Sequence, residues 1–123
     1  MPGSISTVLV VEDDPIIRMN TVDVIGGAGF DVIEASNADA AIQILQAHPE
    51  IRLVFTDIEM PGTMDGLKLA HYIRGRWPKV YLMVASGKVR VGENQLPAGS
   101  KFFTKPYSDD HIVSEIKALL SEV

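Results

Sequence analysis

Short apolar runs recur along the chain, and each gives way to a more polar segment. The first, third and fourth runs do not alternate with polar residues, which is typical of parallel strands covered on both faces. These runs predict five strands, at residues 7–11, 30–35, 53–56, 80–85 and 101–104. Since strand-like and helix-like segments alternate, we predict an α/β fold in which five βα units form one doubly wound parallel sheet with right-handed crossovers.

Capping residues and apolar spacing predict the helices between these strands. Asp14 followed by Pro15 is an N-cap with proline at the first helical position. Ile17, Val24 and Ile25 should form the inner face of the helix that follows, which ends at a group of glycines. The same signals predict helices at about residues 15–28, 38–48, 66–77 and 109–123.

The later helices begin at similar capping residues, with one exception. Either Ser36 or Asn37 caps the second helix, Asp65 starts the third and Ser108 caps the last. A further helix is expected between the fourth and fifth strands, but residues 87–97 contain two glycines and a proline. We therefore predict that this fourth helix is short, frayed or absent, and we hypothesise that the segment orders on activation.

Composition narrows the class of protein. The 123 residues are enough for one domain, spanning 1–123, and 46% hydrophobic with 22% charged residues is an ordinary globular balance. The net charge of −5 argues against nonspecific nucleic-acid binding, and no apolar run is long enough for a membrane helix. The chain has no cysteine, which excludes disulfides and thiolate metal sites. We expect a cytoplasmic protein that binds neither nucleic acid nor membrane.

Polar residues stand where the predicted strands end. Glu12 and Asp13 follow the first strand, Asp57 follows the third, Ser86 the fourth and Lys105 the fifth. Parallel strands bring their carboxyl ends to one rim, where three close carboxylates would repel each other unless a cation such as Mg²⁺ neutralised them. Asp57 could then attack phosphorus in line, while Lys105 and the Ser86 hydroxyl hold the equatorial oxygens.

Together these segments identify a resemblance that covers essentially the whole chain. Any one segment is a weak signal, but five in order on predicted strand ends are a specific one. They are Val10-Val11-Glu12-Asp13, Asp57-Ile58-Glu59-Met60-Pro61, Met64-Asp65-Gly66, Ser86-Gly87 and Lys105-Pro106. The chain resembles the CheY-like receiver domain of bacterial two-component response regulators. The resemblance implies a flavodoxin-like sheet with strand order 2-1-3-4-5.

The resemblance also implies a mechanism and its cofactor. Asp57 would accept a phosphoryl group from a histidine kinase or a histidine phosphotransfer protein. Mg²⁺ would be held by Asp13, Asp57 and the backbone carbonyl of Glu59, with Glu12 acting through water. Ser86 would be the switch hydroxyl and Lys105 the phosphoryl ligand. The chain would catalyse only its own aspartyl phosphorylation and dephosphorylation, and is not otherwise expected to be an enzyme.

Other positions follow from the same resemblance. A cis peptide before Pro106 would aim the preceding ammonium inward. Phe102 stands at the switch aromatic position, where tyrosine is frequent, so its signal must be steric. Glu59 and Lys88 stand two residues after the phosphoacceptor and the switch hydroxyl, where they would pair across the site mouth and obstruct water. The loop from Pro61 to Gly66 is one residue longer than the commonest version.

Several functional alternatives remain open. No output segment follows Val123, so the chain is expected to be a stand-alone relay or the terminal receiver of a hybrid histidine kinase, as a monomer or weak dimer. A pseudo-receiver would bind partners without phosphorylation. A phosphatase of the haloacid dehalogenase type would carry aspartate where Glu59 stands. A flavodoxin-like FMN carrier would need a Ser-, Thr- and Gly-rich first loop, and this chain has Glu12-Asp13-Asp14 there.

Overall fold

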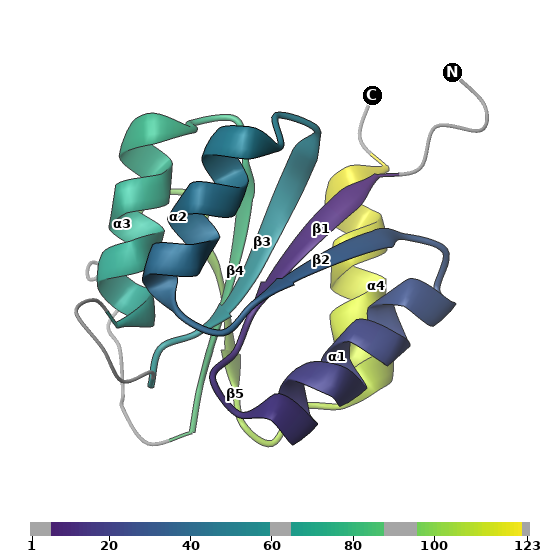
Figure 1. The fold of residues 1–123 in the computed structure, drawn as a ribbon. Helices are drawn as coiled ribbons and strands as arrows, with labels where there is room; N and C mark the ends of the chain where they lie inside the picture. The colour runs from purple at the N-terminus through teal and green to yellow at the C-terminus, as the bar shows by residue number, and fades with distance from the viewer. Residues whose placement is uncertain (1–5, 60–64, 88–95, 122–123) are drawn as a thin grey trace.

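The five predicted strands form one parallel sheet. The structure is a computed structural model and describes residues 6–59, 65–87 and 96–121. The strand order is β2-β1-β3-β4-β5 (Figure 1), which confirms the predicted doubly wound, flavodoxin-like architecture. The strands are β1 (Thr7–Val11), β2 (Asp31–Ala35), β3 (Ile51–Asp57), β4 (Tyr81–Ser86) and β5 (Lys101–Thr104).

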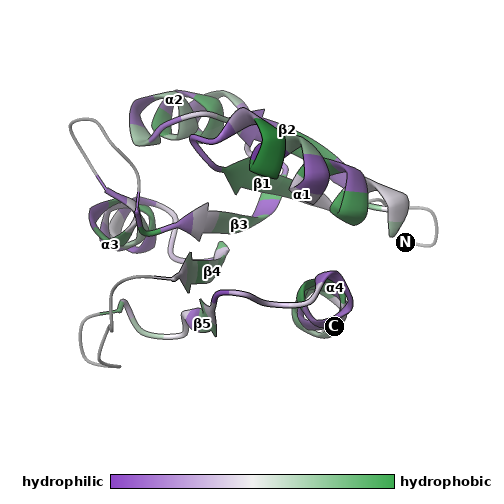
Figure 2. Cartoon of the chain, turned by 90° about the horizontal axis from the view of Figure 1, so that it is seen from below, coloured by the Kyte–Doolittle hydropathy of each residue, from purple (hydrophilic) through white to green (hydrophobic). Residues whose placement is uncertain are grey.

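Helices cover both faces of this sheet. They are α1 (Pro15–Gly27), α2 (Ala38–Ala47), α3 (Gly66–Arg76) and α4 (Asp109–Leu120). Figure 2 shows the sheet between the pair α2 and α3 and the pair α1 and α4. The predicted fourth helix, between β4 and β5, concerns residues 88–95, which lie outside the described ranges.

The predicted capping residues begin these helices. The Asp14 carboxylate accepts hydrogen bonds from the amides of Ile16 and Ile17, and Asp65 accepts from that of Lys68. Of the two candidates for α2, Asn37 is the cap, accepting from the Ala40 amide at 2.8 Å. The Ser108 hydroxyl caps α4 in the same way. Each cap satisfies amides that the first helical turn leaves without a partner.

The core has two layers because successive side chains of a strand point to opposite faces. Leu9 and Val54 pack with α2 and α3, whereas Val8 and Leu53 pack with α1 and α4. These four side chains are fully buried, as the lack of alternation in their strands predicts. The sheet is therefore a rigid base for the residues at its carboxyl edge.

One predicted inner-face residue is wrong. Ile25 of α1 is fully buried, but Ile17 is 41% exposed. The first turn of α1 borders a groove of about 500 Å³ that Lys105, Pro106 and Tyr107 also line. Within residues 6–59, 65–87 and 96–121, no side chain therefore fills the space opposite Ile17. Helical spacing identified the correct face of α1, but it could not show that this face is exposed at the first turn.

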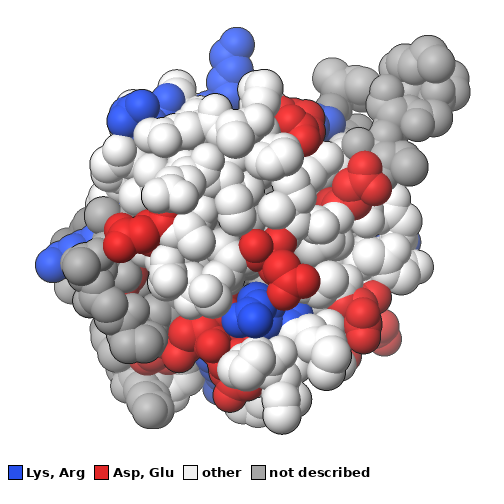
Figure 3. Space-filling view, in the orientation of Figure 1, with Lys and Arg blue, Asp and Glu red and all other residues white. Residues whose placement is uncertain are grey.

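The start of the first strand and the end of the last helix lie at the same edge of the sheet (Figure 1). β1 begins and α4 ends at the edge opposite the carboxyl ends of the strands (Figure 1). Figure 3 shows acidic groups scattered over the front face, with basic groups at its upper edge, at its left edge and in its lower half. None of the helices in the described ranges has the length and apolar character needed to cross a membrane.

Candidate functional site

The sheet order brings the predicted site residues together at one edge. Asp57 ends β3, which lies between β1 and β4. In the register of these strands Asp57 is paired with Ala85, so Ser86 stands one residue further along the neighbouring strand. Glu12 follows directly after β1, and Lys105 follows β5. Four strand ends therefore contribute to a single site.

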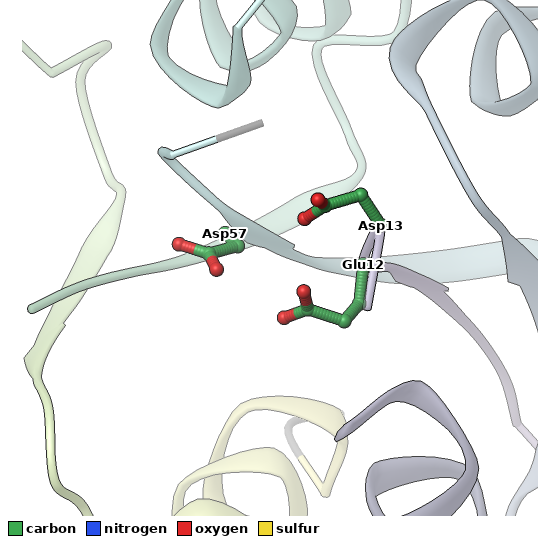
Figure 4. A group of neighbouring side chains, drawn as sticks. All are labelled: Glu12, Asp13 and Asp57. Atoms are coloured by element: carbon green, nitrogen blue, oxygen red, sulfur yellow. The ribbon is translucent and has the colours of Figure 1, made fainter. Parts of the chain in front are cut away.

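Three carboxylates form the acidic part of the site. Glu12, Asp13 and Asp57 each offer an oxygen, and these oxygens all lie within 4.8 Å of one another. Figure 4 shows the Glu12 and Asp13 carboxylates on the side of their loop that faces Asp57. Glu12 and Asp57 are buried at 6% exposure each, whereas Asp13 is half-buried.

The electrostatics of this cluster favour a cation. The pKa of Glu12 is raised from 4.5 to about 7, chiefly by burial. The Asp14 amide, which donates to Glu12 at 3.1 Å, lowers this pKa, and the nearby charge of Asp57 raises it by less than that. Full ionisation of these buried carboxylates is therefore unfavourable unless a cation joins them. An oxygen-only set with few carboxylates is the donor set that Mg²⁺ prefers, so the residues present fit the ion that the sequence implies.

A lysine closes the other side of Asp57. The Nζ atom of Lys105 donates to Oδ2 of Asp57 at 2.6 Å. Burial alone would lower the pKa of this ammonium, but the hydrogen bond and charge of Asp57 outweigh it and raise the pKa above its ordinary value. A Cβ on Gly87 would lie 3.2 Å from the Lys105 side chain, so glycine gives the lysine stem room to pass. The Lys105–Pro106 peptide bond is cis.

The backbone of Asp57 is held by Gly66, which the sequence placed at the start of the third helix without suggesting this contact. A Cβ on Gly66 would lie 1.9 Å from the carbonyl oxygen of Asp57, so only glycine allows α3 to begin this close. The Gly66 amide donates to the Ile58 carbonyl at 3.0 Å, and the Ile58 amide donates to that of Ala85 at 2.9 Å. The available signal was a glycine directly after the helix cap Asp65.

Arg18 was also missed by sequence reasoning. Its guanidinium donates to the Glu12 carbonyl at 2.9 Å and to the Glu34 carboxylate at 2.8 Å. It therefore ties the loop after β1 to β2 and helps to hold Glu12 in the acidic cluster. Nothing in the local sequence marks this role, because Glu34 lies 16 residues away.

Glu59 lies across the site mouth from β4. Its carboxylate accepts a hydrogen bond from the Ser86 hydroxyl through Oε2 and one from the Gly87 amide through Oε1 at 3.1 Å. Its own amide donates to Oδ1 of Asp57 at 3.2 Å. The predicted partner of Glu59, Lys88, lies outside the described residues.

Phe102, the predicted switch aromatic, lies in β5. Its ring is half-buried and packs against the core layer that α2 and α3 cover. The next residue, Phe103, is buried in the opposite layer, where it contacts Phe55 and Tyr107. Phe102 therefore lies on the face of β5 away from α1 and α4.

Comparisons with known proteins identify the family. The sequence profile described as "Response regulator receiver domain" matches residues 8–117. The chain is 31% identical to the sensor kinase CckA of Brucella abortus over 121 residues, 95% of this chain and 13% of the kinase. It is 36% identical to the response regulator protein FleR of Pseudomonas aeruginosa over 119 residues, 94% of this chain and 23% of FleR.

A solved structure supports the same assignment. The receiver domain of the hybrid histidine kinase CckA superposes with a TM-score of 0.80 at 27% identity, covering 93% of this chain and 98% of that domain. The chain spans half or less of the length of these and similar curated relatives. It belongs to the family of response regulator receiver domains, CheY-like signalling modules of two-component systems.

Proposed function

We propose that this domain accepts a phosphoryl group on Asp57 from a histidine kinase or a histidine phosphotransfer protein, and that phosphorylation changes what the domain binds. One observation carries the proposal. The Asp57 carboxylate lies within 4.8 Å of two further carboxylates and 2.6 Å from the Lys105 ammonium, all at one edge of the sheet. This arrangement supports the proposal that Asp57 is the nucleophile, with carboxylates suited to a cation on one side and the Lys105 ammonium on the other.

The residues divide the chemistry between them. An Asp57 carboxylate oxygen attacks phosphorus as the bond from phosphorus to the donor's histidine nitrogen breaks, and that nitrogen keeps the electron pair. Lys105 stays close to Asp57, and its ammonium stabilises the negative charge on the phosphoryl oxygens, as phosphoryl transfer requires. The Ser86 hydroxyl lies on the neighbouring strand as a further donor.

Mg²⁺ is the cofactor that we propose for this step. Glu12, Asp13, Asp57 and the backbone carbonyl of Glu59 would hold it, with Glu12 acting through water. When bound, the ion neutralises the carboxylates and the incoming phosphoryl oxygens. Arg18 and the Asp14 amide keep Glu12 turned toward this cluster in its absence.

The surface beside the site suggests where the phosphoryl donor docks. Ile16, Ile17 and Met19 of α1 are 72%, 41% and 59% exposed, and we call them the α1 patch. The groove next to it shares Lys105 and Tyr107 with the pocket that holds Asp57. An apolar patch at the mouth of a reactive site is a natural docking surface for a protein that must present a histidine there.

Phosphorylation is tested by intact mass. The protein is incubated with Mg²⁺ and acetyl phosphate beside Asp57→Asn, with EDTA as the metal-free control. A Mg²⁺-dependent gain of one phosphoryl group that the variant lacks is the expected result. Absence of any gain, or an equal gain by Asp57→Asn, would refute the proposal, since it requires that carboxylate as the nucleophile.

A further inference from the structure

The contacts of Glu59 carry an inference that rests on the proposed function. Its two carboxylate oxygens accept from two donors at the end of β4, the Ser86 hydroxyl and the Gly87 amide. The bidentate arrangement uses both oxygens of one anionic group on two adjacent residues. Hydrogen bonds to a charged acceptor are stronger than those between neutral groups, so this contact holds the start of the β4–β5 connection against β3.

These two donors are placed where an anion on Asp57 needs them. Asp57 is paired with Ala85 across β3 and β4, and Ser86 and Gly87 are the next two residues of the neighbouring strand. A phosphoryl group on Asp57 adds anionic oxygens at this strand end, and Lys105 supplies positive charge from the β5 side. The Ser86 hydroxyl and the Gly87 amide are the donors that the end of β4 presents.

The same donors cannot serve both anions. A hydroxyl has one hydrogen to donate, and an amide N–H has one. A phosphoryl group and the Glu59 carboxylate are both negative, so they would repel each other if both approached these two donors. Occupation by one therefore opposes occupation by the other.

We propose that Glu59 is a positioning residue that acts as an internal stand-in for the phosphoryl group. In the unphosphorylated domain its carboxylate holds Ser86 and Gly87, and phosphorylation of Asp57 exchanges it for phosphoryl oxygens. The exchange releases the Glu59 side chain toward solvent and repositions the start of the β4–β5 connection. Glu59 thus opposes the activated arrangement and sets how completely phosphorylation populates it.

The contact is tested first without any phosphoryl group. The amide proton of Gly87 is followed by nuclear magnetic resonance in the wild type and in Glu59→Gln, which is of equal size but uncharged. We expect an upfield shift in Glu59→Gln, because the amide loses a charged acceptor. Glu115→Gln removes the same charge from α4 and should leave this resonance in place. An unchanged Gly87 resonance in Glu59→Gln would overturn the proposal whatever the domain does with phosphate.

The exchange is tested with beryllofluoride, a phosphoryl analogue, in the presence of Mg²⁺. Binding is measured by titration calorimetry for the wild type, Glu59→Ala, Ser86→Ala and the double variant. Losing the competing acceptor should tighten binding by about tenfold in Glu59→Ala, the size expected for a hydrogen bond to a charged group. The gain should shrink strongly in the Ser86→Ala background, since the two residues compete through that hydroxyl.

The outcomes separate this inference from the proposed function. If wild type and Glu59→Ala bind the analogue equally, the domain is a competent receiver and the role of Glu59 is refuted. An equal gain with and without Ser86 would show simple charge repulsion, and would refute the exchange. If neither the wild type nor Glu59→Ala binds the analogue or gains mass with acetyl phosphate, the proposed function fails and the exchange fails with it.

Discussion

Replacing Glu12 with glutamine tests how strongly the site opposes its own charge. Glu12 is only 6% exposed, and burial raises its pKa from 4.5 to about 7. Between pH 4.5 and about 7, the folded protein therefore keeps a proton on Glu12 that the unfolded chain releases. The contribution of Glu12 to the free energy of unfolding should accordingly be most favourable below pH 4.5. It should be lost as the pH rises through about 7.

The size of the effect follows from the pKa. A rise from 4.5 to about 7 is worth about 3 kcal/mol at 1.36 kcal/mol per unit. Water reaches the cluster beside the half-buried Asp13 and Lys105, and its screening should reduce the effect to about 1–2 kcal/mol. Glutamine keeps an oxygen for the Asp14 amide but carries no charge. We therefore expect Glu12→Gln to be more stable than the wild type by about 1–2 kcal/mol at about pH 8.

Urea denaturation in EDTA at several pH values measures this difference. The advantage of Glu12→Gln should shrink toward zero as the pH falls toward about 4. Added Mg²⁺ should reduce the advantage at high pH, because a bound cation stabilises the wild-type carboxylates. Glu115→Gln is the control for a general loss of negative charge and should show neither trend. A gain that does not change with pH, or no gain at about pH 8, would refute the electrostatic account of the cluster.

Three further perturbations test the site and its surroundings. Gly66→Ala should destabilise by about 1–3 kcal/mol in urea denaturation, because its Cβ would lie 1.9 Å from a backbone oxygen. Gly75→Ala, with nothing within 4 Å, should instead be neutral or stabilising, and equal effects would contradict the packing argument. Lys105→Met should bind Mg²⁺ several-fold more tightly by calorimetry, since the ammonium no longer neutralises the acidic cluster; unchanged or weaker binding counts against this. The double variant Ile16→Ser/Met19→Ser should slow transfer from a phosphorylated histidine phosphotransfer protein, relative to the wild type, but not transfer from acetyl phosphate. If the variant changes both rates by the same factor, or neither, docking on the α1 patch is excluded.

Much of the fold was predictable because its signals are local. Unbroken apolar runs identified the buried strands, and Asp14, Asp65 and Ser108 each marked the start of a helix by the hydrogen bond that the side chain makes. Ile17 was misplaced for the opposite reason. Its burial depends on whether another element reaches the first turn of α1, and helical spacing contains no information on that distance.

The site divides in the same way. That Glu12, Asp57 and Lys105 share one edge follows from the parallel order of the strands, which the sequence predicted. The contact between Glu59 and Ser86 joins residues that are 27 positions apart and depends on how a loop side chain folds back over the edge. Loop side-chain directions follow no sequence period, so this contact required the three-dimensional structure.

The placement of the chain's entry and exit has a consequence for how such a domain is used. β1 begins and α4 ends at the edge away from Asp57 (Figure 1), so covalent attachments at either end leave the reactive edge open. A domain of this kind can therefore be fused to unrelated domains without any change to its site. The relatives fit this reasoning, since matching segments make up 13% of a sensor kinase and 48% of a transcriptional regulator. Portability is thus a geometric property of the sheet, separate from the chemistry performed on it.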